Sequence, residues 1–328
     1  MKKIILTLLA VIMVIGLTAC GADANNSANV NSAGSSSEPE KTSVTIKTLN
    51  AGKNEVELEV PYNPQRIAIL DLAALDIIDS LGIGDRVVGM ASTSIEYLKD
   101  YSENSSLKNL GTIKEADLEA VVECEPDIIF IGGRLSGSYD ALSEIAPVVY
   151  LSTDTEIGLV ESVSKNAGII ASIFGLEDEA ASKMADFSAR IEAIKKISEG
   201  KTALVGMTTS GSFNLLGNDG RCSLIGVEAG FNNLTAAGST STHGNESSFE
   251  TVVKQNPDYI FVMDRDSAIS SSGAKTAAEI MENDLIKTTD AYKNNHIIYL
   301  EHPDVWYTAE GGIQALDIML NDLENGLK

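Results

Sequence analysis

The sequence predicts an α/β protein built from two Rossmann-like lobes that are joined by one long helix. The first observation is a repeat: residues 115–134 and 246–265 agree at nine of twenty aligned positions. The second is the alternation of short apolar runs with helical segments on both sides of the chain's centre, which is typical of βαβ units and a mostly parallel sheet. The third is a stretch of helical character between them, at 156–199. Duplication around a helical link indicates two similar lobes.

The two copies of the repeat have the same internal order. Each begins with polar residues that can cap a helix, continues through an apolar helical stretch and meets Pro126 or Pro257. Each then enters a short apolar run, which stops at Arg134 in the first copy and at Arg265 in the second. In open α/β sheets ligands bind at the carboxyl ends of the strands. We therefore expect both arginines to face a common cleft.

The first lobe is expected at residues 44–155. Apolar runs predict strands at 66–70, 87–90, 127–132 and 148–151. The first strand is followed by leucine and isoleucine residues at helical spacing, and this helix ends at Gly82, a residue suited to a helix C-terminus.

The second lobe is expected at residues 200–328, with strands at 202–207, 214–217, 259–264 and 297–300. A terminal helix over 311–327 has an apolar face made by Ile313, Leu316, Met319, Leu320 and Leu323. The link at 156–199 contains few helix breakers, and one long helix allows only slight hinging of the lobes. A break near Gly175 is the alternative.

The first 43 residues have a different character. Lys2 and Lys3 precede an apolar run, 4–16, which is too short to span a bilayer and predicts a secretory signal peptide over 1–19. The segment that ends at Cys20 and Gly21 looks like a bacterial lipobox, in which this cysteine is lipidated; a plain signal peptide is the alternative. Residues 20–43 are rich in Ala, Asn, Ser and Gly, as in a flexible tether.

The charge of the chain limits its partners. Its formal net charge is −23, from 47 acidic and 24 basic residues, which argues against a nucleic-acid partner. Arginines at a cleft in an acidic protein indicate a small anionic ligand. Cys124 and Cys222 are too few for a disulfide framework and are expected to be core thiols.

Three further residues are candidates for the site. Arg221 lies in a glycine-rich loop, His243 lies just before the second repeat helix, and Tyr307 lies beside the only tryptophan. An imidazole or a phenol oxygen can coordinate a metal or contact an anion. Solvated turn residues and a packed aromatic pair are the alternatives. The sequence contains no catalytic motif such as GxSxG or a P-loop, so we expect a binding function rather than an enzyme.

Taken together, the lipobox, the doubled repeat, the helical link and the segment WYTAEGG resemble the iron-siderophore class of substrate-binding lipoproteins that serve ABC importers. The resemblance covers essentially all of the mature chain and implies the class III periplasmic-binding-protein fold. Within that class, THGNESSFE, DVWY and the three arginines are similar to members that bind ferric catecholate siderophores, including petrobactin-type binders.

The resemblance implies roles for five residues. Arg134, Arg221 and Arg265 would form a cationic surface for the ferric siderophore. His243 and Tyr307 would complete the coordination of iron when a siderophore supplies four of six donors, and would only line the cleft when it supplies all six. Haem or corrinoid binding is the alternative within the same transporter class.

The resemblance also implies how the protein works in the cell. Glu119 and Glu250, which occupy equivalent repeat positions, would engage the permease; acids favoured at helix N-termini are the alternative. We expect a monomer without a permanently bound cofactor, anchored through its lipid on the extracytoplasmic face of the cell membrane.

Overall fold

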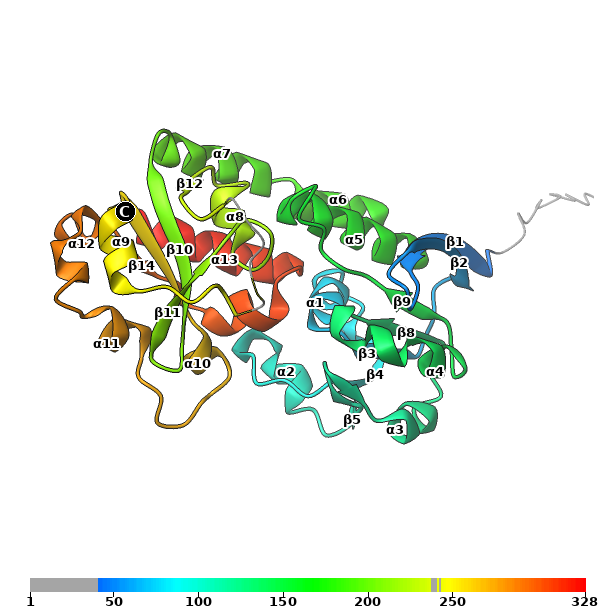
Figure 1. Cartoon of the computed structure of the whole chain (residues 1–328). Helices are drawn as coiled ribbons and strands as arrows, with labels where there is room; N and C mark the ends of the chain where they lie inside the picture. The colour runs from blue at the N-terminus through cyan, green and yellow to red at the C-terminus, as the bar shows by residue number, and fades with distance from the viewer. Residues whose placement is uncertain (1–40, 237–240, 242) are drawn as a thin grey trace, which may run out of the picture. The chain divides into compact units, whose positions relative to one another are not determined.

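The computed structural model describes residues 41–236, 241 and 243–328 (Figure 1). The predicted signal peptide, Cys20 and the predicted tether as far as residue 40 lie outside the described residues. Within the described ranges, no helix is both long enough and apolar enough to cross a membrane.

The first lobe contains a five-stranded parallel sheet in the order β5-β4-β3-β8-β9. Its strands are β3 (Ile67–Leu70), β4 (Val87–Met90), β5 (Lys108–Asn109), β8 (Ile128–Ile131) and β9 (Val148–Tyr150). The central strands β3 and β8 are buried at every residue, because their continuous apolar runs are covered on both faces. The four predicted strands are confirmed. The helices of this lobe are α1 (Leu72–Ser80), α2 (Lys99–Ser102), α3 (Leu118–Glu123) and α4 (Tyr139–Ser143).

The second lobe is built around the strand order β11-β10-β13-β14. The strands are β10 (Thr202–Thr209), β11 (Ser212–Leu216), β13 (Tyr259–Asp264) and β14 (Ile297–Tyr299), with the short β12 (Asn232–Asn233) beside β10. Only β11 is antiparallel to its neighbour. The helices are α8 (Ser223–Gly226), α9 (Phe249–Gln255), α10 (Arg265–Ala268), α11 (Ala277–Met281), α12 (Asp290–Lys293) and α13 (Ile313–Gly326). These positions confirm the predicted strands and terminal helix.

The sequence repeat forms equivalent structures in the two lobes. Helix α3 leads into strand β8, and helix α9 leads into strand β13. Asp117 caps α3 by accepting a hydrogen bond from the backbone N–H of Ala120 (3.0 Å), and Ser248 caps α9 through the backbone N–H of Thr251 (3.3 Å). The predicted cap, helix and strand are therefore present in both copies.

The link between the lobes corrects one prediction. One uninterrupted helix over 156–199 is wrong, because the chain forms α5 (Leu159–Phe174), α6 (Glu177–Met184) and α7 (Phe187–Ser198). The alternative break near Gly175 is present. Gly175 closes α5 with a φ of 71°, a left-handed conformation that favours glycine. The hydroxyl oxygen of Tyr62 lies 2.3 Å from the position of an added Cβ, so a side chain has no room there.

A hairpin that the sequence analysis did not predict precedes the first parallel strand. Strands β1 (Ser43–Leu49) and β2 (Glu55–Pro61) pair antiparallel along their whole length. The hydroxyl group of Thr48 donates to the backbone oxygen of Tyr150 (3.0 Å) and accepts from its N–H (2.8 Å), which ties the hairpin to β9. The hairpin could have been predicted from the sequence, because apolar and polar residues alternate in VTIKTL and in EVELEV on either side of a polar turn.

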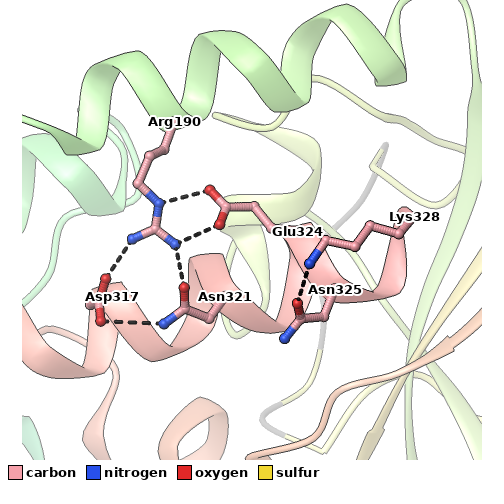
Figure 2. Close-up of polar contacts among 6 residues, drawn as sticks. All are labelled: Arg190, Asp317, Asn321, Glu324, Asn325 and Lys328. Atoms are coloured by element: carbon pink, nitrogen blue, oxygen red, sulfur yellow. Dashed lines mark hydrogen bonds and ion pairs between the residues drawn. The ribbon is translucent and has the colours of Figure 1, made fainter.

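One hydrophobic cluster of the described residues draws on both lobes, while two further clusters lie within the first and the second lobe. The shared cluster contains Leu75 of α1, Ile170 of α5, Ile194 of α7 and Leu316 of α13, all almost fully buried. An ion-pair network reinforces the contact of α7 with α13 (Figure 2). There Arg190 binds the carboxylate of Glu324 with two donors, at 2.7 and 3.0 Å, and also contacts two further polar residues of α13.

A buried carboxylate joins the helix α1 of the first lobe to the terminal helix α13. Asp76 of α1 accepts the backbone N–H groups of Gln314 and Ala315, each at 2.8 Å, and the hydroxyl of Tyr97 at 2.8 Å. These N–H groups belong to the first turn of α13, which has no partner for them inside the helix. Gly312 makes this approach possible, since an added Cβ would lie 2.3 Å from the Asp76 carboxyl carbon. One lobe therefore caps a helix of the other.

We predict that Asp76→Ala lowers the free energy of unfolding by about 2 kcal/mol or more, because it removes a helix cap and leaves buried donors unpaired. Urea unfolding measures the difference. Asp100→Ala, at an exposed position of α2, is the control and should change stability by less than about 0.5 kcal/mol. Equal stability of the two variants would contradict a structural role for the Asp76 cap.

Candidate functional site

Tyr307 is the point at which the three predicted arginines meet. Arg265 donates from Nε to the phenol oxygen of Tyr307 (3.2 Å). The backbone oxygen of Tyr307 accepts hydrogen bonds from Arg221 Nε (3.3 Å) and from Arg134 Nη2 (3.5 Å). The guanidinium carbon of Arg221 lies 4.3 Å from the centre of the Tyr307 ring, within the range of a cation–π contact. The structure thus brings together four of the five predicted site residues.

The three arginines follow strands, and Tyr307 lies in a short helical turn. Arg134 follows β8 in the 3-10 turn η3 (Gly133–Ser138), so the strand ends at Ile131 rather than at the arginine itself. Arg265 directly follows β13 as the first residue of α10, and Arg221 lies between β11 and α8. Tyr307 lies in the π-helical turn η5 (Val305–Ala309), a conformation found often at functional sites.

A cavity of about 880 Å³ adjoins this cluster, a size suited to a small molecule. Residues from both lobes line it, including Asp71, Arg134, Tyr150, Arg221, Tyr307 and Glu310. Arg265 and His243 are not among the described residues that line this cavity. Two of the three arginines therefore reach the cavity itself, and the third contacts it through Tyr307.

The arginines are electrostatically crowded. Burial and then the nearby charge of Arg221 lower the pKa of Arg134. Arg265 is paired with the buried carboxylate of Asp266 (3.1 Å). Since like charges that are partly removed from water repel each other, an anion placed between Arg134 and Arg221 would relieve the repulsion.

His243 lies at the edge of this charged region. Its side chain is exposed, and its backbone oxygen accepts a hydrogen bond from the Asn214 side chain (2.9 Å). Partial desolvation, followed by the positive charges of Arg265 and Arg221, lowers the pKa of His243. The imidazole is therefore mostly neutral near pH 7, and the neutral form is the one that coordinates metals.

Two half-buried acids that line the cavity were not predicted. Asp71 caps α1 through the backbone N–H of Ala74 (3.1 Å), and burial raises its pKa to about 6. Glu310 follows η5, and burial raises its pKa to about 7. Asp71 had a signal in the sequence, because it directly follows the buried strand β3 at the edge where ligands bind. Glu310 had none, because its burial depends on the packing between the lobes.

The two predicted docking residues occupy equivalent surface positions. Glu119 lies in the first turn of α3 and Glu250 in the first turn of α9, and both are exposed. Hydrogen bonds from a backbone N–H group and from the Ser248 hydroxyl lower the pKa of Glu250, as expected for an acid at a helix N-terminus. Leu118 and Val122 beside Glu119 are 40% and 55% exposed, so the surface of α3 is partly apolar.

Both cysteines of the described chain have free thiols and are buried, as predicted. Burial raises the pKa of Cys222 above its usual range, which makes this thiol unreactive.

Comparisons with known proteins agree on one family. The family described as "Periplasmic binding protein" matches residues 67–303. The petrobactin-binding protein YclQ of Bacillus subtilis is 34% identical over 335 aligned residues, which cover all of both chains. The ferric-anguibactin-binding protein FatB of Vibrio anguillarum is 26% identical and covers 88% of this chain and 89% of its own.

A solved structure gives the same result. The periplasmic catecholate-siderophore binding protein VctP of Vibrio cholerae superposes with a TM-score of 0.78 and 30% identity, over 86% of this chain and 100% of its own.

The raised carboxyl pKa values predict how stability depends on pH. Between about pH 4 and pH 7 the unfolded chain has released the protons of Asp71 and Glu310, while the folded chain still holds them. Their contribution to stability is therefore present at low pH and falls as the pH rises through this window. When the pH is raised from 5 to 8, the free energy of unfolding of Glu310→Gln should therefore increase by about 1–2 kcal/mol relative to that of the unsubstituted protein.

Urea unfolding at both pH values measures this gain. Glu156→Gln is the matched control, because Glu156 lines the same cavity but is exposed and should gain nothing. A Glu310→Gln stability difference that does not change with pH would contradict a buried, protonated Glu310.

Proposed function

Since this chain belongs to the periplasmic binding protein family, whose members bind solutes for transport and are not enzymes, we propose that it captures a ferric siderophore, of the catecholate type, for an ABC importer. The chain has the class III fold of two lobes. The observation that carries the proposal is the group of three arginines around Tyr307 at a cavity between the lobes.

The chemistry of the cluster fits such a ligand. Catecholate oxygens keep their negative charge when they bind iron, so a ferric catecholate complex is a compact anion. Guanidinium groups donate several hydrogen bonds in one plane and contact aromatic rings, so they can bind both the oxygens and the rings of a catecholate. Arg134 and Arg221 line the cavity, where a bound ligand would exclude water and charge-assisted hydrogen bonds would be strong.

Tyr307 and His243 can contribute to the iron site when the siderophore supplies four donor oxygens. Arg265 donates a hydrogen bond to the phenol oxygen of Tyr307, and a phenolate oxygen is a hard donor suited to Fe(III). His243 would supply a neutral imidazole from the edge of the second lobe. With a siderophore that supplies six donors, both residues would act as contacts only.

Delivery would use surfaces outside the cleft. Glu119 and Glu250 present one exposed carboxylate on each lobe, at equivalent ends of α3 and α9, which suits a permease with a cationic residue for each lobe. Lipidation at Cys20, with the segment 21–42 as a tether, would hold the protein at the outer face of the membrane. The predicted tether is one residue too long, because Ser43 is the first residue of strand β1. Haem or a corrinoid would require His243 and Tyr307 as axial ligands.

The double variant Arg134→Ala/Arg265→Ala should bind a ferric bis-catecholate at least 100-fold more weakly, because two groups that form charge-assisted hydrogen bonds are lost. Quenching of intrinsic fluorescence during titration gives Kd. Arg190→Ala is the control, since Arg190 lies in the ion-pair network of α7 and α13 outside the cleft (Figure 2), and its Kd should change less than threefold. Undiminished affinity of the double variant would exclude the arginine cluster as the site, and absence of binding by the unsubstituted protein would exclude the proposed ligand.

Docking of the protein to the permease can be tested separately from its capture of the siderophore. We predict that Glu119→Ala/Glu250→Ala keeps the Kd for the ferric complex within about twofold but reduces uptake of radioactive iron in cells at least tenfold, because removing two interfacial ion pairs weakens association. The matched control is Glu115→Ala/Glu246→Ala, the other pair of exposed acids at equivalent repeat positions. Normal uptake with the first pair removed would contradict the docking role.

A further inference from the structure

A second buried carboxylate ties the turn that carries Tyr307 to the terminal helix. Asp322 of α13 is 2% exposed and contacts the segment that precedes its own helix. Its Oδ2 accepts the backbone N–H of His302 (3.0 Å) and the indole N–H of Trp306 (2.9 Å), and its Oδ1 contacts Nδ1 of His302 (2.7 Å). Trp306 is the second residue of η5, so this carboxylate holds the turn at its start.

The indole of Trp306 fixes the orientation of the turn. Its side chain is fully buried in the hydrophobic cluster that draws on both lobes. A buried indole N–H needs an acceptor, since an unpaired buried donor costs about 1–3 kcal/mol, and Asp322 is that acceptor. The hydrogen bond therefore favours one orientation of the ring, and this orientation sets the path of the backbone into the next residue, Tyr307.

Tyr307 is in turn the shared partner of the arginine cluster. Its backbone oxygen accepts hydrogen bonds from Arg221 and Arg134, and its phenol oxygen accepts one from Arg265. The chain after the turn is held separately, because Asp76 accepts the first N–H groups of α13. Buried carboxylates thus fix the turn on both sides, and supporting contacts of this kind keep binding groups within about 0.5 Å of their working geometry.

We propose that Asp322 is a positioning residue for iron capture, which holds the phenol oxygen of Tyr307 where it can occupy an open coordination position of the bound ferric ion. This inference rests on the proposed function and extends it to a residue that is not among those described as lining the cavity. A metal–ligand distance tolerates a change of only about 0.2 Å, whereas the long side chains of the arginines can follow a small shift of the turn. The dependence on Asp322 should therefore be confined to complexes that need the phenol as a donor.

The first test removes the carboxylate. Asp322→Ala should bind a ferric bis-catecholate, which supplies four donors, at least about tenfold more weakly than the unsubstituted protein does. Its affinity for a ferric tris-catecholate, which supplies all six donors, should change less than about threefold. Isothermal titration calorimetry gives Kd for both complexes.

A conservative variant separates the hydrogen bonds of Asp322 from its charge. Both N–H donors bind the same oxygen, Oδ2, so an amide oxygen in that place can accept both of them. The amide NH2 group would then face Nδ1 of His302, which accepts a hydrogen bond in one neutral tautomer. Asp322→Asn should therefore keep Kd for the bis-catecholate complex within about threefold of the unsubstituted value.

Trp306→Phe tests the same contact with a smaller change, and it carries the test where Asp322→Ala does not fold. It keeps an aromatic ring in the core and removes one donor, so the bis-catecholate complex should weaken at least about fivefold. In a Tyr307→Phe background the same substitution should have less than about a twofold effect, because the group that it positions is already absent. Calorimetry suits this series, since Trp306 is the only tryptophan of the chain.

The control is Asn325→Ala, at an exposed position of the same helix (Figure 2), which should leave Kd unchanged. Four results would overturn the positioning role: unchanged bis-catecholate affinity in the Asp322→Ala and Trp306→Phe variants or in Tyr307→Phe, equal weakening of the four-donor and six-donor complexes, a loss in Asp322→Asn as large as in Asp322→Ala, or an undiminished effect of Trp306→Phe in the Tyr307→Phe background. Failure of the unsubstituted protein to bind either ferric complex would instead contradict the proposed function.

Discussion

The site depends on the hydrogen bonds by which Asp76 of the first lobe caps the terminal helix of the second. The carboxylate holds the N-terminus of α13 against α1, and only glycine at position 312 leaves room for it. The chain immediately before this cap carries Glu310 and the π-helical turn with Tyr307. This contact between the lobes thereby fixes where the aromatic and acidic groups of the site lie relative to the first lobe.

The repeated and unrepeated parts of the chain supply different chemistry. The repeat places Arg134 and Arg265 after equivalent strands, because helix, strand and loop recur in the same order. The unrepeated segments add Arg221, Tyr307 and Glu310, and all three belong to the second lobe. The duplicated architecture thus supplies cationic groups that can bind an anionic ligand. The orientation and the selection of that ligand depend on residues that only the second lobe contains.

Much of the fold was predictable from the sequence, because the central strands are continuous apolar runs and the repeat marks equivalent positions. The placing of Arg134 and Arg265 was predictable for the same reason, since each follows a parallel strand at the carboxyl edge of its own lobe's sheet. Arg221 was only a candidate, because it follows the antiparallel strand β11 in a glycine-rich loop. The break at Gly175 was only an alternative, because a glycine inside a helical pattern does not show whether a side chain such as Tyr62 occupies the space beside it. The role of Asp76 was not predictable, because its hydrogen-bond partners on α13 are more than 200 residues away in the sequence. The role of Glu310 was not predictable either, because its environment depends on the packing between the lobes.

The charges of the cleft are more balanced than the arginines suggest. Arg265 is paired with Asp266, Arg134 lies near Asp71, and Arg221 lies near Glu310. The chain as a whole carries a formal charge of −23, so at long range it repels an anionic ligand rather than attracting it. Salt screens that repulsion beyond about 10 Å, and inside the cavity desolvated pairs dominate. Binding of a ferric complex to this cleft is therefore determined by the match of individual donors and acceptors rather than by long-range attraction.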